Sequence, residues 1–344
     1  MTMIWLTWRQ FRAQAIAAAA VLAMLAIALA VTGPYMAHLY DGSGIATCTG
    51  SSCGPLTNAF SNKLPGFDTV IYLLGLGIMF LTPAVIGVFW GAPLITREIE
   101  ARTLPLTFNQ SVTKTRWLAV KLGLTGLASM ATAGLLSLML TWWSSPMDST
   151  MEIPYGHRLL LERLGPVLFA ARGVAPLGYA AFAFALGVTA GMLTRRTVSA
   201  MAATLGAFAA VQFVWAEWIR AHLVAPVTTI MPLNASTISV VGIRNGVMSL
   251  QAAPALTQQG AWVLSGQVIN TSGHPAQVPA SAACLGSVSQ ACASWLARFH
   301  FRELISYQPA SRFWTFQWVE TGIFAALALA LAGICTWWLI RRVG

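Results

Sequence analysis

The chain has 344 residues, of which 57% are hydrophobic and only 9% are charged. Soluble globular domains carry about 25% charged residues, so this sequence lacks the polar surface that a water-soluble fold of its length needs. These proportions exclude a soluble enzyme or a nucleic-acid-binding domain as the first hypothesis. The positions of the few charges should instead mark the ends of membrane spans.

Six uncharged stretches are long and apolar enough to cross a bilayer, which takes about 20 apolar residues. A central Asp, Lys or Arg costs about 2.5–3.5 kcal/mol on insertion scales, so uncharged runs at six places are strong evidence. The predicted spans contain Ala15–Met36, Val70–Ile95, Leu122–Trp143, Val174–Leu193, Val198–Ala216 and Thr321–Ile340. The sequence therefore predicts an all-α integral membrane protein with six transmembrane helices.

Two further uncharged stretches, Ala221–Ile243 and Asn245–Ala297, contain Pro, Gly, Asn and Ser at many positions. Unpaired backbone groups are costly in lipid, so we place both stretches outside the membrane, although a reentrant segment over 221–243 stays open. We expect a small extracytoplasmic cap of mixed secondary structure over residues 221–318, before the sixth span and tail at 319–344.

The first thirteen residues place Ile4, Trp8 and Phe11 at helical spacing, with Arg9 and Arg12 nearby. Tryptophan favours the headgroup level of a bilayer, so residues 1–13 are predicted to form an interfacial helix. Spans one to five then occupy residues 14–220. The alternative is that residues 1–13 are the beginning of the first span.

Positive charge sets the orientation, because Lys and Arg concentrate on the cytoplasmic side. With the N-terminus inside, 11 of the 20 Lys and Arg residues fall in roughly 45 cytoplasmic residues, and the outer segments hold the rest. The cytoplasmic set is Arg9, Arg12, Arg97, Arg102, Lys114, Arg116, Lys121, Arg195, Arg196, Arg341 and Arg342. Both termini are therefore predicted to be cytoplasmic.

Four of the five cysteines fall on the predicted outer side, where disulfides persist. Cys48 and Cys53 enclose one short polar loop, and Cys284 and Cys292 enclose another. Four cysteines allow three connectivities; we expect the local pairs 48–53 and 284–292, against the alternative that their placement is chance. Cys335 lies inside the sixth span.

The link after the second span, residues 96–121, is the one predicted cytoplasmic loop long enough to contact another protein. It mixes charged with apolar residues, and Glu98 and Arg102 lie four apart, which favours a short helix. Pro105 predicts the end of that helix near Thr103 or Leu104. The alternative is a solvated, positively charged loop.

Sequence motifs for chemistry are absent. No GxxxxGK[ST] phosphate-binding loop occurs, and the five histidines are scattered singly without a zinc-binding pattern. No catalytic residue, no metal site and no nucleic-acid partner are predicted. Glu217 and Glu320 lie near span ends and are interpreted as structural end caps rather than proton relays. Five residues are candidates for a solute pathway, against the alternative of ordinary packing: Tyr72, Phe80, Gln212, Phe213 and Trp215.

Three segments together resemble the membrane subunit of bacterial type-2 ATP-binding-cassette transporters, with the closest similarity to actinobacterial members. They are MIWLTWRQFRAQ near the start, GAPLITREIEARTLPLTFNQSVTKTRWLAVKLG after the second span, and YQPASRFWTFQWVETGIFAALALALAGICTWWLIRRV at the end. The outer segment before the last span is larger than the helical hairpin usual in that family.

The resemblance implies a permease half that pairs with a second copy, forming a homodimer, and with two separate ATPase subunits. This chain would then carry no cofactor, while ATP and Mg would bind the ATPase. A coupling helix would lie within Arg97–Ser111, and the implied contact residues are Arg97, Glu98, Glu100, Arg102, Thr103, Leu104, Phe108, Gln110 and Ser111.

We therefore expect an exporter in the bacterial cytoplasmic membrane, moving a hydrophobic or amphipathic compound such as a drug, antibiotic or lipid. Export of drugs by such a protein would contribute to multidrug resistance. The alternatives are a sensory or immunity complex of the same architecture that acts on a membrane-active peptide, an integral membrane enzyme, or a passive anchor subunit.

Overall fold

The computed structural model describes residues 3–48, 53–63, 66–101, 113–151, 164–233, 238–244, 247–252, 261–279 and 290–342. Within these ranges, six helical segments are long and apolar enough to cross a membrane, which confirms the six predicted spans. The spans are α1 (Met3–Asp41), α3 (Gly66–Ile86) continued by η3 (Gly87–Gly91) and α4 (Pro93–Glu100), α6 (Lys114–Met151), α8 (Ala175–Thr194), α9 (Thr197–Val214) continued by η4 (Trp215–Ile219) and α10 (Arg220–His222), and α13 (Phe313–Arg342).

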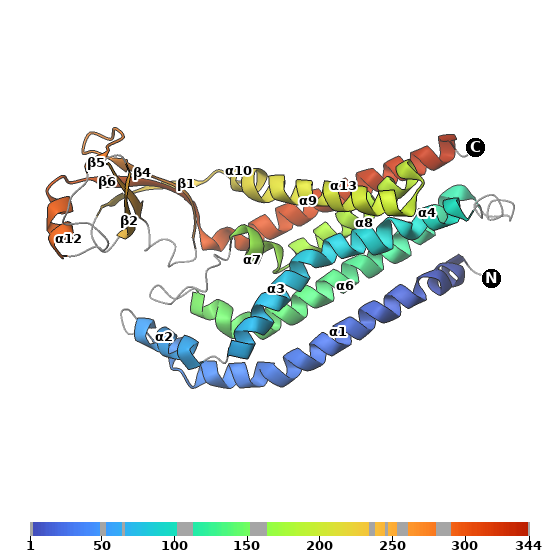
Figure 1. Ribbon diagram of the computed structural model, residues 1–344, viewed down its shortest axis with the longest axis horizontal. Coiled ribbons are helices and arrows are strands. Elements are labelled where there is room, and N and C mark those ends of the chain that lie inside the picture. Colours follow the sequence, from blue (N-terminus) through green and yellow to red (C-terminus); the bar gives the residue numbers. More distant parts are fainter. Residues whose placement is uncertain are drawn as a thin grey trace.

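The spans form an elongated bundle with strands at one end (Figure 1). Both chain termini lie at the opposite end, together with the end of α4 and the turn between α8 and α9. We call this the termini end and the other the sheet end. Short elements lie toward the sheet end: η1 (Ile45–Thr47), α2 (Cys53–Lys63) and α7 (Pro166–Ala170).

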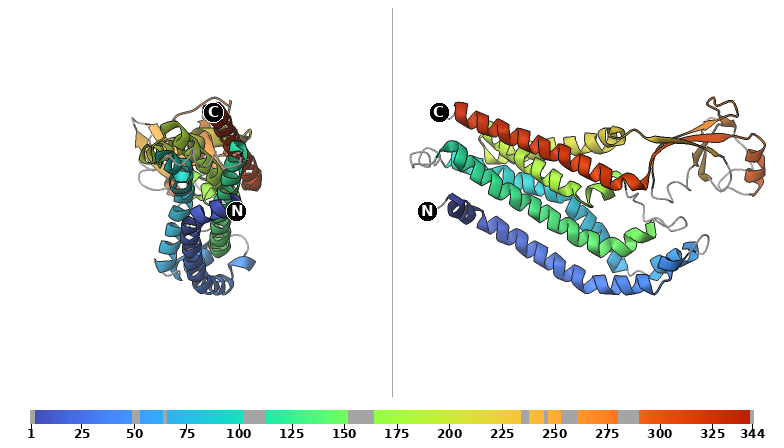
Figure 2. Two further views of the ribbon diagram at one scale, coloured as in Figure 1. Left: turned by 90° about the vertical axis from the view of Figure 1, so that its right-hand side faces the viewer. Right: turned by 180° about the vertical axis from the view of Figure 1, so that it is seen from behind.

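Helix α1 runs without a break through residue 13, so residues 3–13 and the first span belong to one helix of 39 residues. Its first turns, darkest blue in Figure 2, bend away from the axis of the rest of the helix. Trp5 and Trp8 are exposed there, whereas Phe11 is buried. The predicted boundary between residues 13 and 14 is therefore absent from the secondary structure.

Helix α8 is the centre of the bundle. A larger share of its apolar stretch is buried than in any of the other five spans. It packs against α13, α6, α9 and α3. Because both sides of α8 meet other helices, its buried residues point in all directions and it lacks an apolar stripe. Helix α1 is the least buried span and packs on α6 at the edge of the bundle.

Glycines permit a close backbone contact between the π-helical turn η3 and α8. A Cβ added at Gly87 would lie 2.6 Å from the Ala183 carbonyl oxygen, and one at Gly187 would overlap the Gly87 carbonyl oxygen and lie 2.8 Å from the Ala92 nitrogen. Small residues allow such backbone approach in membrane helices. Gly77, by contrast, has open space beside it.

Replacing Gly187 by alanine is expected to destabilise the protein by about 1–3 kcal/mol, because overpacking forces two backbones apart. Thermal unfolding of the purified chain in detergent, followed by its monodisperse fraction, measures the effect. Gly206→Ala on α9 is the matched control, since nothing lies within 4 Å of its added Cβ. Equal unfolding temperatures for the two variants would contradict the assigned contact.

The sheet end corrects the all-α fold class, because six strands form among the described residues of the segment where a cap of mixed structure was expected. They are β1 (Val227–Pro232), β2 (Ile238–Arg244), β3 (Val247–Ala252), β4 (Trp262–Ile269), β5 (Val278–Pro279) and β6 (Arg302–Gln308), with α12 (Gln290–Ala297) before β6. Their β-branched residues favour strands. The order is β1-β6-β4 in one antiparallel sheet and β2-β3-β5 in the other.

Strand β6 returns the chain to the bundle and is fixed there by two polar side chains. Gln308 donates to the Val224 carbonyl at 2.7 Å, and Arg312 in η7 (Ala310–Arg312) donates to the Ala225 carbonyl at 2.7 Å and to Gln308 Oε1 at 2.8 Å. These bonds join the beginning of α13 to the end of α10. The two ends of the segment between the fifth and sixth spans are therefore held side by side.

The cysteine prediction falls partly outside the residues that the structure describes. Cys335 is a buried free cysteine, whereas Cys48 and Cys292 are disulfide-bonded. The side chain of Cys53 and all of Cys284 lie outside the described residues. The local pairing therefore stays a prediction.

Candidate functional site

Glu98 of α4 lies at the centre of a polar contact at the termini end. Its Oε1 accepts a hydrogen bond from Lys121 of α6, with which it forms an ion pair, and a second one from Gln10 of α1 at 3.3 Å. The Lys121 ammonium group also lies 4.6 Å from the ring centre of Trp117. Both charged side chains are largely buried, so this contact connects three spans.

Glu100, at the end of α4, connects the same span to a fourth. Its carboxylate accepts hydrogen bonds from the backbone nitrogen and the hydroxyl of Thr197, both at 2.8 Å. Thr197 is the first residue of α9, and a carboxylate at a helix N-terminus is favoured by the helix dipole. The Thr197 hydroxyl also lies 2.8 Å from that of Thr96.

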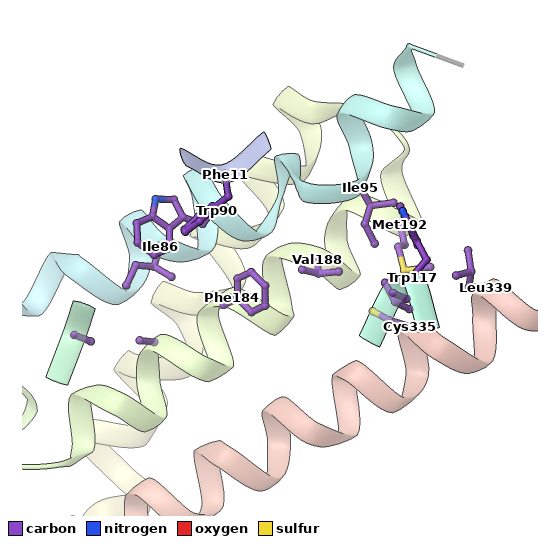
Figure 3. Close-up of a cluster of buried hydrophobic side chains, with 13 residues drawn as sticks. Phe11, Ile86, Trp90, Ile95, Trp117, Phe184, Val188, Met192, Cys335 and Leu339 are labelled. Atoms are coloured by element: carbon purple, nitrogen blue, oxygen red, sulfur yellow. The ribbon is translucent and has the colours of Figure 1, made fainter. Parts of the chain in front are cut away.

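Helix α1 contacts the second span one turn further along. Gln14 donates to the Phe89 carbonyl in η3 at 2.9 Å, and Phe11 meets Trp90 edge to face at 4.9 Å between ring centres. A π-helical turn shifts the hydrogen-bond pattern of a helix, and Gln14 provides a donor to one carbonyl there. Figure 3 shows Phe11 against Trp90 and the buried side chains that continue the contact toward α13.

The predicted coupling residues divide into two groups. Arg97, Glu98 and Glu100 lie on α4, where Arg97 and Glu98 line a cavity of about 210 Å³ together with Gln10 and Gln14. Helix α4 ends at Glu100, earlier than the predicted end near residue 103. The others lie outside the described residues: Arg102, Thr103, Leu104, Phe108, Gln110 and Ser111.

A larger cavity of about 390 Å³ lies nearer the sheet end, between α3, α7, α8, α9 and η4. It is lined by Phe80, Gln212 and Phe213, which are three of the five predicted pathway residues. Tyr72 and Trp215 do not line it: Tyr72 is buried against α6 and the Arg172 guanidinium, and Trp215 is buried against Phe324. Pockets of 300–1,000 Å³ hold drug-sized molecules.

A buried ion pair adjoins this cavity. Arg220 in α10 donates to both carboxylate oxygens of Glu320 in α13, at 2.9 and 3.0 Å. Tyr179 of α8 donates to Glu320 Oε1 and accepts from Arg220 at 3.2 Å. The guanidinium also lies 4.4 Å from the ring centre of Phe169. Arg220 and Tyr179 both line the cavity.

The sequence prediction missed Arg220 and Tyr179, and it placed Glu320 as an end cap. One feature of the sequence could have drawn attention to Arg220: it follows an apolar run and lies three residues beyond Glu217. The sequence carries no sign that its partner is a carboxylate 100 positions away. Among the residues that the structure describes, no group of three His, Cys, Asp or Glu side chains offers a metal site.

Comparison with known proteins gives one result that bears on identity. No similar curated protein and no similar solved structure was found. A family model described as "ABC-2 membrane transporter related" matches residues 19–220, from the first span through the end of the fifth. With six apolar helices, this match identifies a multi-pass membrane protein. The chain belongs to the ABC-2 membrane transporter related family.

Proposed function

We propose that this chain is the permease subunit of an ATP-driven exporter, which moves a hydrophobic or amphipathic compound out of the bacterial cytoplasm. A separate ATPase subunit supplies the energy. The observation that carries the proposal is the bracing of α4. Contacts of Glu98 and Glu100 connect this helix to α1, α6 and α9, so a force applied to the link that follows α4 reaches four spans.

The proposed orientation puts the termini end in the cytoplasm. Arg9, Arg97, Arg195 and Arg341 all belong to segments at that end, as the distribution of positive charge requires. The link after α4 then faces the ATPase, and the bent first turns of α1, with exposed Trp5, lie along the inner membrane surface. Two such chains and two ATPases form the proposed complex.

The proposed transport pathway includes the cavity lined by Phe80, Gln212 and Phe213. Its walls are mainly apolar, and its few polar residues are Tyr179, Gln212, Glu217 and Arg220. This combination suits a drug, antibiotic or lipid with one polar group. Binding of ATP and substrate must each favour one state of the bundle over the other, since a ligand shifts a conformational equilibrium only by its differential affinity.

Purification of the tagged chain from its native membrane tests the proposal. A subunit with a phosphate-binding loop should co-purify, and its ATP hydrolysis should rise in the presence of the chain. Phe108→Ala in the link is expected to abolish this stimulation while membrane insertion is unchanged. Purified complexes that hydrolyse no ATP, or hydrolysis indifferent to the permease, would show that the assignment is wrong.

The outer location of the sheet end has its own test. We expect Cys48, Cys53, Cys284 and Cys292 to resist thiol labelling on intact cells until a reductant is added, because disulfides persist outside the cytoplasm. Cys335, buried in the bundle, serves as the internal reference for denatured samples. Mass-shift labelling measures the change, and four reactive thiols before reduction would contradict the pairing.

A further inference from the structure

The large cavity carries an uneven distribution of charge. Arg220 and Glu217 are the two charged residues that line it. The Arg220 charge is compensated, since the guanidinium is bound at two nitrogens by the buried Glu320 carboxylate. The hydroxyl of Tyr179 is likewise engaged with both of them. These three groups together bring no net charge to the cavity.

Glu217 is the charge that remains. It lies in η4 on the exposed side of the helix and forms no ion pair or hydrogen bond with any residue that the structure describes. The cavity walls around it are mainly apolar, and charge–charge attraction is stronger beside such low-dielectric walls than in bulk water. A carboxylate in such a setting favours a positively charged ligand over a neutral or negative one.

Aromatic rings provide the rest of the ligand's environment. Phe80 of α3 and Phe213 of α9 are both substantially exposed and line the cavity, and Phe208 lines its inner part. The faces of aromatic rings attract cations, and more strongly where water is excluded. Apolar groups attached to the cation would be buried against the same rings.

We propose that this cavity binds a lipophilic monocation, whose apolar groups contact Phe80, Phe208 and Phe213 and whose positive charge lies beside Glu217. The inference rests on the proposed function, because it takes the cavity as part of the transport pathway. It narrows the substrate class from amphipathic compounds in general to those with one positive charge.

Equilibrium binding to the full chain in lipid nanodiscs tests the inference with two probes of the same shape and opposite charge, tetraphenylphosphonium and tetraphenylborate. Saturable binding of the phosphonium should exceed that of the borate at least tenfold, after subtraction of empty nanodiscs. Glu217→Gln is expected to raise the Kd for the phosphonium about tenfold, which is about 1.4 kcal/mol. The matched control is Asp41→Asn, an exposed carboxylate at the end of α1.

A second variant keeps the test decisive if Glu217→Gln does not fold. Leu205→Trp should fill the cavity and abolish saturable binding. Retained binding in this variant, an unchanged Kd in a folded Glu217→Gln, or equal affinity for both probes would overturn the inference. Failure of the proposed function is distinguishable: the phosphonium would still bind with the stated charge preference, but no ATPase would co-purify or respond.

Discussion

Replacing Arg220 by methionine is expected to destabilise the folded chain by about 3–5 kcal/mol, since it leaves the Glu320 carboxylate buried without its partner. Both side chains are buried, with 1% of Arg220 and none of Glu320 exposed, and they join α10 to α13 across 100 positions of sequence. Loss of the monodisperse protein after heating in detergent is the measurement. Glu320→Leu alone should produce a loss of the same order, because it strands the guanidinium.

The double variant Arg220→Met with Glu320→Leu should recover most of the stability. Removing both charges also removes the cost of taking them out of water, so apolar replacements of similar volume are often neutral or stabilising. Tyr179 then loses one acceptor, which sets a limit on the recovery. This pattern, in which each single change is severe and the pair is mild, separates a mutual contact from two independent ones.

Arg298→Met is the control for losing an arginine, because Arg298 is exposed beside α12. It should unfold at the temperature of the unchanged chain. If Arg220→Met also did so, the ion pair would contribute nothing to the junction of α8, α10 and α13. The double variant would then have no lost stability to recover, so it would test nothing.

The six spans could be predicted because charged side chains are costly in the hydrocarbon core of a membrane. This rule applies to each stretch of sequence separately. Strand pairing, by contrast, depends on segments that are far apart in the sequence. Strand β6 pairs with β1 and with β4, and β1 lies some 75 positions earlier, so residues 221–318 showed only β-branched runs and turn residues. Mixed structure was therefore predictable, but the order of the strands was not.

The candidate site was predictable to a similar degree. Phe80, Gln212 and Phe213 were identified as pathway residues and do share a cavity wall, because the second and fifth spans both pack against α8. Arg220 was missed, since its importance comes from the distant Glu320. The family resemblance implied Glu98 and Glu100 as contacts for an ATPase, which stays a prediction, and it did not indicate that both carboxylates also accept hydrogen bonds within the chain. Sequence spacing cannot tell an inward contact from an outward one.

Charge reversal at Glu98 is expected to reduce ATPase stimulation by the permease to its basal level. Glu98→Lys places a second ammonium group beside Lys121, where the unchanged carboxylate forms an ion pair and also accepts from Gln10. Like charges repel strongly in this largely buried position, so the end of α4 should separate from α6. Stimulated ATP hydrolysis in the purified complex measures the loss.

The exchange Glu98→Lys with Lys121→Glu decides what Glu98 does. Restored stimulation would show that Glu98 acts by bracing α4 within the chain, because the exchange rebuilds the ion pair with its direction reversed. A folded double variant without stimulation would instead show that the Glu98 carboxylate itself contacts the ATPase, as the sequence had suggested. Lys63→Glu, at an exposed position of α2 near the sheet end, should leave stimulation unchanged. Bracing is the expected result, since one oxygen of Glu98 already serves both α1 and α6.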